Sequence, residues 1–332
     1  MVGGAGLVSP LCPGRGILAR LGMITTITLN PSIDRTLEID RLVVGGLNRV
    51  KSKIDHPSGK GINVSRVLSR LGQPTKALAL VGGDNGKWLV DTLGAEGIVL
   101  DYVQVQGDTR TNLKIWAMAE GRETEINEPG PTVTQDELGK LQSRVLEGAA
   151  KWDWVVISGS MPPGTPPDFY ATLVESAKSQ GAKVVLDASG AALREGLKAC
   201  PDLIKPNKVE VTELLGWEPQ DRAGAMIAVR ELVERGISYV LLTLGKDGAF
   251  VGHGDRVWQA TPPEVPVKTT VGCGDSTVAG MLHGLMQGAG IEEAIRWAMA
   301  TGAAAATTWG TEPPKLEVVR ELLPLVEIRR RQ

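Results

Sequence analysis

The chain has 332 residues, of which 42% are hydrophobic, and its formal net charge at pH 7 is −2. This length and hydrophobic content suffice for one large core, or for a core with a small appendage. The basic residues are dispersed, which argues against nucleic-acid binding, and no apolar run of about 18 residues is present that would cross a membrane.

The cysteines and the single basic run do not change this interpretation. Cys12, Cys200 and Cys273 have no metal-ligand spacing, and their odd number favours a reducing compartment over a disulfide framework. We therefore expect a cytoplasmic protein. The run Arg329-Arg-Arg331 is expected to be a solvated terminal segment.

Residues 1–22 are rich in Gly and Pro and have no periodic apolar face before Ile17. A signal peptide would need a longer uninterrupted apolar core. We expect either a disordered extension or a start codon assigned too early, with the folded part beginning at Met23.

From Met23 to about residue 328, short apolar runs of strand length alternate with segments of helical periodicity. The predicted strands are 24–29, 77–81, 154–158, 183–187, 202–204 and 239–244. The predicted helices are 62–71, 88–96, 136–149, 168–179, 221–235, 275–287, 292–307 and 316–326. This alternation predicts an α/β fold: a doubly wound, mostly parallel sheet with helices on both faces and ligands at the C-terminal strand ends.

Two stretches interrupt the alternation. Residues 36–55 and 110–125 are extended and alternating in pattern, with no helical segment inside them. They predict a separate small β-sheet within the same domain.

The segment Thr269-Thr-Val-Gly-Cys-Gly-Asp-Ser276 carries the clearest chemical signal. It opens a predicted helix, so Gly272, Cys273 and Gly274 contribute backbone N–H groups that have no intrahelical partner and can bind a phosphoryl anion. Asp275 beside them can accept the proton of an attacking hydroxyl group. The alternative is a tight turn followed by a helix-capping Asp.

This segment resembles the C-terminal signature of the ribokinase-like (PfkB) sugar kinases, Thr-x-Gly-Ala-Gly-Asp. Cys273 replaces the family's usual Ala at a position that contributes its backbone. Six further segments are in the family's order and cover, with the signature, about residues 23 to 325: Asn30-Pro-Ser-Ile-Asp34, Ser58-Gly-Lys-Gly-Ile-Asn-Val64, Thr109-Arg-Thr-Asn-Leu-Lys-Ile115, Thr124-Glu-Ile-Asn-Glu-Pro-Gly-Pro131, Ser158-Gly-Ser-Met-Pro-Pro-Gly164 and Lys205-Pro-Asn-Lys-Val-Glu210. The second and third are specific to the branch that contains 1-phosphofructokinase and tagatose-6-phosphate kinase.

The resemblance implies an ATP- and Mg²⁺-dependent kinase that phosphorylates the free primary hydroxyl of a ketohexose phosphate. Fructose 1-phosphate and tagatose 6-phosphate both remain candidate substrates. It also implies that the small sheet is a lid over the sugar site, shared with a second subunit in a homodimer. A catalytically silent sugar-phosphate sensor is a second class of function, but such a sensor would not need Asp275, its flanking glycines or Glu210.

Candidate sugar-site residues lie in the N-terminal half. Asp34, after the first strand, can accept hydrogen bonds from sugar hydroxyls, or can cap a turn. Arg110 can bind the existing phosphate with its guanidinium, although an isolated Arg is more often solvated. Asn112 and Lys114 share a face with Arg110. The remaining candidates are Gly59, Lys60, Gly61 and Asn63 at a helix start, where free N–H groups and an ammonium suit an anion, together with Ser160.

The nucleotide-side candidates lie towards the C-terminus. In the family's Asn-x-x-Glu element, Glu210 would act on Mg²⁺ through water. Small residues at 302–306 would let an adenine ring approach the helix backbone, or would serve close helix packing. The other nucleotide candidates are Lys205, Asn207, Thr243, Gly245, Lys246 and Gly248.

Overall fold

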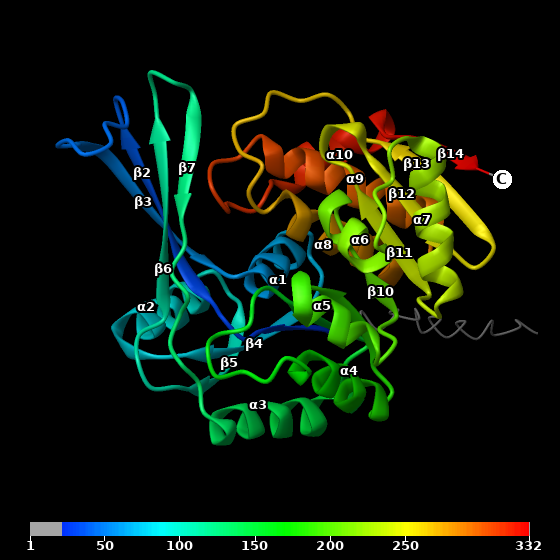
Figure 1. The fold of residues 1–332 in the computed structure, drawn as a ribbon, viewed down its shortest axis with the longest axis horizontal. Coiled ribbons are helices and arrows are strands. Elements are labelled where there is room, and N and C mark those ends of the chain that lie inside the picture. The colour runs from blue at the N-terminus through cyan, green and yellow to red at the C-terminus, as the bar shows by residue number, and fades with distance from the viewer. Residues whose placement is uncertain (1–21, 332) are drawn as a thin grey trace, which may run out of the picture.

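The computed structural model describes residues 22–331, so the expectation for residues 1–21 lies outside the described part of the chain. Its larger sheet has ten strands in the order β14-β13-β12-β11-β10-β9-β8-β1-β4-β5 (Figure 1). Seven strands are parallel: β1 (Ile24–Thr28), β4 (Thr75–Val81), β5 (Val99–Gln104), β8 (Trp154–Ser158), β9 (Lys183–Asp187), β10 (Leu203–Ile204) and β11 (Tyr239–Thr243). β12 (Ala249–His253), β13 (Arg256–Thr261) and β14 (Glu327–Arg331) continue the sheet antiparallel.

Helices cover both faces of this sheet (Figure 1). One face carries α3 (Gln135–Gly148), α4 (Phe169–Ser179), α5 (Gly190–Leu197), α6 (Lys208–Leu215) and α7 (Arg222–Glu234). The other carries α1 (Lys60–Arg70), α2 (Gly83–Ala95), α8 (Cys273–Met286), α9 (Ile291–Ala306) and α10 (Leu316–Leu322). The predicted α/β class, with a mostly parallel sheet between two helical layers, is confirmed.

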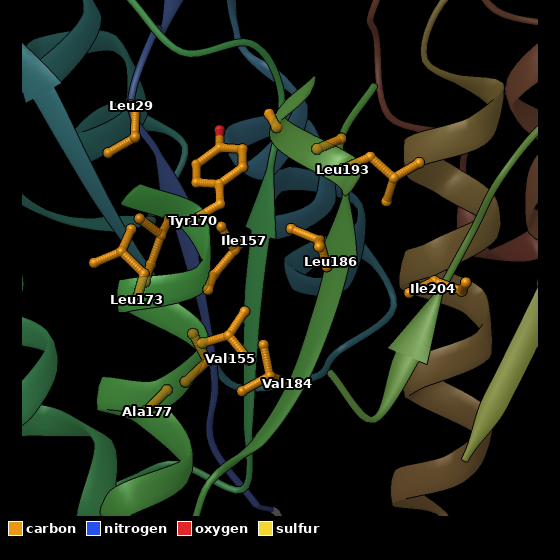
Figure 2. Packing of buried hydrophobic residues seen from close by; sticks show 14 of the residues in the cluster. Leu29, Val155, Ile157, Tyr170, Leu173, Ala177, Val184, Leu186, Leu193 and Ile204 are labelled. Atoms are coloured by element: carbon orange, nitrogen blue, oxygen red, sulfur yellow. The ribbon is translucent and has the colours of Figure 1, made fainter. Parts of the chain in front are cut away.

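Successive residues of the central strands face opposite helical layers, which explains why these strands read as continuous apolar runs. Val155 and Ile157 of β8 pack with Tyr170 and Leu173 of α4 (Figure 2), whereas Val156 packs with the α8 layer. Each of these side chains is fully buried. Burying a Val, Leu or Ile side chain stabilises a fold by about 1.5–3 kcal/mol, so the core is anchored at this part of the sheet.

The strand order contains a switch point at β1. From β1 the chain moves outward to β4 and β5, and it then returns to the other side of β1 as β8 and continues to β9, β10 and β11. Loops at the C-terminal ends of β1 and β8 therefore diverge to opposite sides. In open α/β sheets this divergence creates the crevice in which ligands bind.

The second sheet has four strands in the order β3-β2-β6-β7 and projects away from the helical layers (Figure 1). It consists of β2 (Ser32–Ile39), β3 (Val50–Ser58), β6 (Arg110–Ala117) and β7 (Arg122–Ile126). These bounds extend beyond the predicted segments 36–55 and 110–125. β2 follows β1 after a short turn, and β3 leads directly into α1, so both ends of this hairpin are tied to the switch point.

Some elements were not expected. The helix predicted over 316–326 ends at Leu322, and a 3-10 turn (Leu323–Leu325) leads into β14. Arg329–Arg331 belong to β14 and pair with β13, which the sequence did not predict. The side chains of Arg329 and Arg330 are exposed, in agreement with the expected solvated run, whereas Arg331 is half-buried and donates to Gln259 Oε1. Within residues 22–331, none of the helices has the length and apolar character needed to cross a bilayer.

Candidate active site

Asp275 lies in the first turn of α8. Gly272 precedes the helix with a φ of 74°, a left-handed conformation that favours glycine. The Asp275 carboxylate is buried, and Asn63 Nδ2 donates to its Oδ2 at 2.8 Å. Burial raises the pKa of Asp275 to about 6, against an opposing effect of Lys60. The structure thus gives a carboxylate that takes up a proton near neutral pH, as a general base must.

The start of α8 also forms an anion-binding nest, because its first N–H groups have no partner within the helix. A Cβ atom at Gly274 would lie 3.4 Å from Lys205 Nζ, so the Lys205 ammonium rests against this turn. Burial raises the pKa of the Cys273 thiol to about 11, and the side chain therefore stays protonated. A thiolate at Cys273 is therefore not formed near neutral pH, and only its backbone N–H is left to bind an anion.

A buried carboxylate that was not predicted links two of the predicted lysines. Asp187, at the end of β9, is 1% exposed, and its Oδ1 lies 3.3 Å from Lys60 Nζ and 3.4 Å from Lys205 Nζ. Burial alone would raise the pKa of Asp187, but Lys205 and Lys60 hold it below its usual value. Asp187 in turn raises the pKa of Lys60. Asp275 also raises the pKa of Lys60, so the Lys60 ammonium lies near this carboxylate.

The small sheet contributes a second buried ion pair. Strand register places Asn112 of β6 and His56 of β3 directly beside Asp34 of β2. Lys114 Nζ lies 2.6 Å from Asp34 Oδ2, and Asn112 Nδ2 donates to Asp34 Oδ1 at 3.1 Å. Burial would raise the pKa of Asp34, but the Lys114 ammonium holds it below the usual value. Asp34 is therefore ionised and fixed in orientation.

Arg110 is a cation without a carboxylate partner among the described residues. Its guanidinium donates to the Glu128 carbonyl at 2.8 Å, to the Asn30 carbonyl at 3.1 Å and to Ser160 Oγ at 3.4 Å. These neutral partners orient the guanidinium, but they do not form an ion pair with it. Burial lowers the pKa of Arg110, and the carboxylates of Asp34 and Glu128 only oppose this effect. The predicted residues Arg110 and Ser160 are thus brought together, and their pairing suits an incoming anion.

The glycines at the start of α1 serve packing as well as ligand access. Gly59 precedes the helix with a φ of 121°. A Cβ atom at Gly61 would lie 2.5 Å from Thr28 Oγ1, so only glycine lets α1 approach β1 this closely. This close approach carries Lys60 and Asn63 to the switch point.

The other nucleotide-side candidates lie at the start of α6 and in the turn after β11. Asn207 and Glu210 make a capping box at the start of α6, in which Glu210 Oε2 accepts from the Asn207 N–H at 2.9 Å. Thr243 pairs with Asn207 in an isolated parallel bridge. Gly245 and Lys246 lie in the 3-10 turn that follows β11, and Gly248 ends that turn. Lys246 is exposed, and no ion pair links it to another residue in the described range.

Several buried polar atoms near the switch point lack hydrogen-bond partners within residues 22–331. They are Asn30 Oδ1, Arg110 Nε, Asn112 Oδ1, Ser158 Oγ and Asp187 Oδ2. Burying an unpaired polar group costs about 1–3 kcal/mol, so their gathering in one region indicates a site for a polar ligand. Asn30 and Asp187 were missed from the sequence, although both stand at or just beyond the C-terminal end of a strand.

The described residues could hold Mg²⁺ only with help from a ligand. They contain no group of three or more His, Cys, Asp or Glu side chains that could bind a metal by themselves. Mg²⁺ in nucleotide sites is held by phosphate oxygens, water and one or two carboxylates. Glu210, with its second oxygen, fits that requirement.

Comparison with known proteins agrees with this geometry. The family model described as pfkB family carbohydrate kinase matches residues 27–317. The chain belongs to this family. It is therefore a sugar kinase, a phosphotransferase with an alcohol group as acceptor, as the signature at Asp275 predicted.

Individual relatives cover nearly the whole chain. A 1-phosphofructokinase from Bacillus subtilis (strain 168) is 39% identical over 308 residues, which are 93% of this chain and 100% of that protein. Phosphofructokinase-2 from Escherichia coli, solved in complex with potassium, is 32% identical with a TM-score of 0.87, covering 92% of this chain and 99% of that one. The same enzyme in complex with fructose-6-phosphate gives 30% identity and a TM-score of 0.85 with the same coverage.

Proposed function

We propose that this pfkB-family kinase transfers the γ-phosphoryl group of MgATP to the free primary hydroxyl of fructose 1-phosphate, giving fructose 1,6-bisphosphate. The observation that carries the proposal is the buried Asp275 carboxylate in the first turn of α8, with a pKa of about 6, between an anion nest and the switch point. A non-catalytic sensor would have no use for a base in this position.

Asp275, Asn63 and the N–H groups at the start of α8 have different roles in the proposed reaction. The ionised Asp275 accepts the proton of the sugar hydroxyl as its oxygen attacks the phosphoryl group. Asn63 keeps the carboxylate oriented through its 2.8 Å hydrogen bond. The N–H groups at the start of α8 stabilise the negative charge of the transferring phosphoryl group. Each of these groups is fixed by the fold before substrate binds, so little reorganisation is needed.

The nucleotide is assigned to the side of the nest that faces Lys205, Asn207 and the turn after β11. The Lys205 ammonium lies against Gly274, where it could bind a phosphate oxygen of the nucleotide. Residues 245–248 form a compact turn next to Asn207. When bound, Mg²⁺ would neutralise charge on the nucleotide phosphates, with Glu210 acting through ordered water. An enzyme that consumes ATP also fits the proposed cytoplasmic location.

The sugar is assigned to the small sheet and the crevice beneath it. Asp34 and Asn112 present a carboxylate and an amide oxygen to hydroxyl groups. The Arg110 guanidinium, which forms no ion pair with a described residue, is assigned to the existing phosphate. Among the candidates, fructose 1-phosphate is favoured because the relative with 39% identity is a 1-phosphofructokinase.

The experiment compares ATP turnover with fructose 1-phosphate, fructose 6-phosphate and tagatose 6-phosphate as acceptors. Fructose 1-phosphate should give the highest kcat/KM. Fructose 6-phosphate is included because the structural relative that binds it shares the fold and 30% of its residues. A higher kcat/KM for either of the other sugars would reassign the substrate, and no turnover with any of them would favour the sensor.

A variant of Arg110 tests the phosphate assignment. Arg110→Ala removes a charge-assisted interaction of about 1.5–3 kcal/mol, so KM for fructose 1-phosphate should rise by about 10- to 150-fold. KM for unphosphorylated fructose should not change, because that sugar never uses the contact. If KM for ATP rises instead, or both sugars weaken equally, the anchor of the existing phosphate lies elsewhere.

We also propose a homodimer formed through the small sheet. Its face opposite Asp34 carries Leu37, Leu113, Ile115 and Ile126, and the side chain of Ile126 is 51% exposed. An apolar stripe on a sheet that projects from the body suits burial against a second copy.

A further inference from the structure

One buried carboxylate orders two cations that come from separate parts of the chain. Lys60 is the first residue of α1, Lys205 follows β10, and both ammonium groups reach the same oxygen, Asp187 Oδ1. Lys and Arg side chains lose much conformational freedom when they are ordered. Asp187, fixed at the end of a central strand and 1% exposed, therefore determines where both charges lie.

The two ammonium groups flank the place where charge develops in a phosphoryl transfer. Lys205 Nζ would lie 3.4 Å from a Cβ atom at Gly274, so it touches the anion nest. The Lys60 ammonium lies close enough to Asp275 to oppose the rise of its pKa. In a loose transition state the charge is spread over three equatorial oxygens, and two cations held beside the nest would face different oxygens.

We propose that Asp187 is a positioning residue for catalysis, which acts by holding the Lys60 and Lys205 ammonium groups on either side of the transferring phosphoryl group. This inference rests on the proposed kinase function and adds a residue to it. It also assigns the Lys60 ammonium, which the sequence predicted only to suit an anion, to the phosphoryl group in transfer. Asp187 does not touch the substrate in this arrangement; its effect passes through the two lysines.

Asp187 has a second, electrostatic effect on the base. The groups that face Asp275 are Lys60 of α1, Asp187 of β9, Lys205 after β10 and the neutral amide of Asn63, with the neutral Cys273 thiol on α8 itself. Of these, Asp187 is the like charge that disfavours ionisation of Asp275. Removing it should make Asp275 easier to ionise, whereas a loss of packing would have no such effect.

The test is the variant Asp187→Asn, which keeps the shape and removes the charge. We expect kcat with fructose 1-phosphate to fall by about 10- to 150-fold, the loss expected for one charge-assisted interaction, while KM for the sugar changes little. The acidic limb of the kcat profile should shift to lower pH by roughly one unit. The matched control is Asp101→Asn: Asp101 of the edge strand β5 also pairs with two cations, Lys76 and Arg144, and its loss should leave kcat unchanged.

A double-mutant cycle separates positioning from structure. In a Lys60→Gln background, Asp187→Asn should reduce kcat much less than it does alone, because one of its two targets is gone. Full additivity would overturn the proposal. If Asp187→Asn instead raises the Mg²⁺ concentration needed for half-maximal rate and recovers normal kcat at saturating Mg²⁺, Asp187 is a metal ligand, and the proposal is likewise overturned.

Two controls keep these outcomes distinct. Thermal unfolding of each variant shows whether it folds. If Asp187→Asn does not fold, the test uses Lys60→Gln and Lys205→Gln, each of which leaves the Asp187 carboxylate one lysine partner. Each of these two variants must then lower kcat without changing KM for the sugar. Wild-type turnover tests the kinase function separately. An active wild-type enzyme whose folded Asp187→Asn variant is equally active contradicts the positioning role alone.

Discussion

At the scale of single residues, Asp275 carries the largest predicted effect on activity. General-base catalysis contributes about 10²–10⁴ in rate, so Asp275→Asn should lower kcat by at least this range. The amide retains an oxygen for the Asn63 hydrogen bond, so KM for sugar and for ATP should change little. Steady-state kinetics measure both quantities. Asp221→Asn is the matched control, because Asp221 caps α7 outside the site; an Asp275→Asn enzyme with more than about a tenth of wild-type kcat contradicts the base.

The ionised Asp275 carboxylate should also lower the free energy of unfolding. Burial raises the pKa of Asp275 from its usual 3.8 to about 6 in the folded protein, so the folded state binds the proton more tightly than the unfolded state. The contribution of Asp275 to the free energy of unfolding is therefore fully present below about pH 4, and it is lost as the pH rises through about 6. At pH 7 the ionised group costs up to about 3 kcal/mol.

Asp275→Asn should consequently be more stable than wild type at pH 7, by about 1–3 kcal/mol, and nearly equal to it at pH 4. Urea unfolding at the two pH values measures the difference. A variant that is less stable at pH 7 would show that the lysine pairing outweighs the burial of the carboxylate. Wild-type kcat should also fall below about pH 6, where the base becomes protonated.

Sequence patterns could predict Asp275 and its glycines because a small-residue turn before an apolar helix has a local signature. Asp187 has none: it ends the run Lys-Val-Val-Leu-Asp and reads as the end of a strand. Its role depends on Lys60 and Lys205, which are remote in the chain and meet it only after α1 and β10 are placed. The same limit applies to Lys114, which was predicted to share a face with Arg110 but not to pair with Asp34.

At the scale of elements, α8 and α9 pack so closely that only glycine fits between them. A Cβ atom at Gly284 would lie 2.5 Å from Ala294 Cα, and one at Gly280 would lie 2.4 Å from the Trp297 carbonyl oxygen. A Cβ atom at Gly302 of α9 would lie 2.4 Å from Thr277 Oγ1 of α8, which supports the close-packing interpretation of residues 302–306. This contact holds α8, and with it the Asp275 turn, against the rest of the helical layer.

Gly284→Ala should therefore destabilise the protein by about 1–3 kcal/mol, because an added methyl group in a packed interface forces the helices apart. Gly139→Ala is the matched control: Gly139 lies in α3 with nothing within 4 Å of its added Cβ, so this change should stabilise by about 0.5–1 kcal/mol. The midpoint of urea unfolding measures both. Equal effects of the two substitutions would contradict the close packing.

The predictable elements were those with a strong local pattern. All six predicted strands form parallel strands of the large sheet, since each is a buried apolar run. β5 was missed because it is an edge strand with an exposed Val99, and β14 because it is built from Arg and Glu. α5 and α6 have eight residues each, which is too short for helical periodicity to show.

At the scale of the whole molecule, the apolar stripe on the small sheet predicts self-association. A stable interface usually buries about 1,600 Å² in total, and a four-stranded sheet that meets its own copy offers a self-complementary surface for it. We expect a dimer at micromolar concentration in sedimentation velocity experiments. Ile126→Glu should shift the protein to monomer, because it places a charge in the stripe.

Ile227→Glu is the matched control for this experiment. Ile227 on α7 is 58% exposed, similar to the 51% of Ile126, but it lies outside the small sheet. It should leave the dimer intact. If both substitutions dissociate the dimer, or if neither does, the contact between subunits is elsewhere. A wild-type monomer would reject the dimer itself and leave the apolar stripe without an occupant, whereas loss of sugar binding together with dimerisation in Ile126→Glu would show that the small sheet needs its partner copy to close over the substrate.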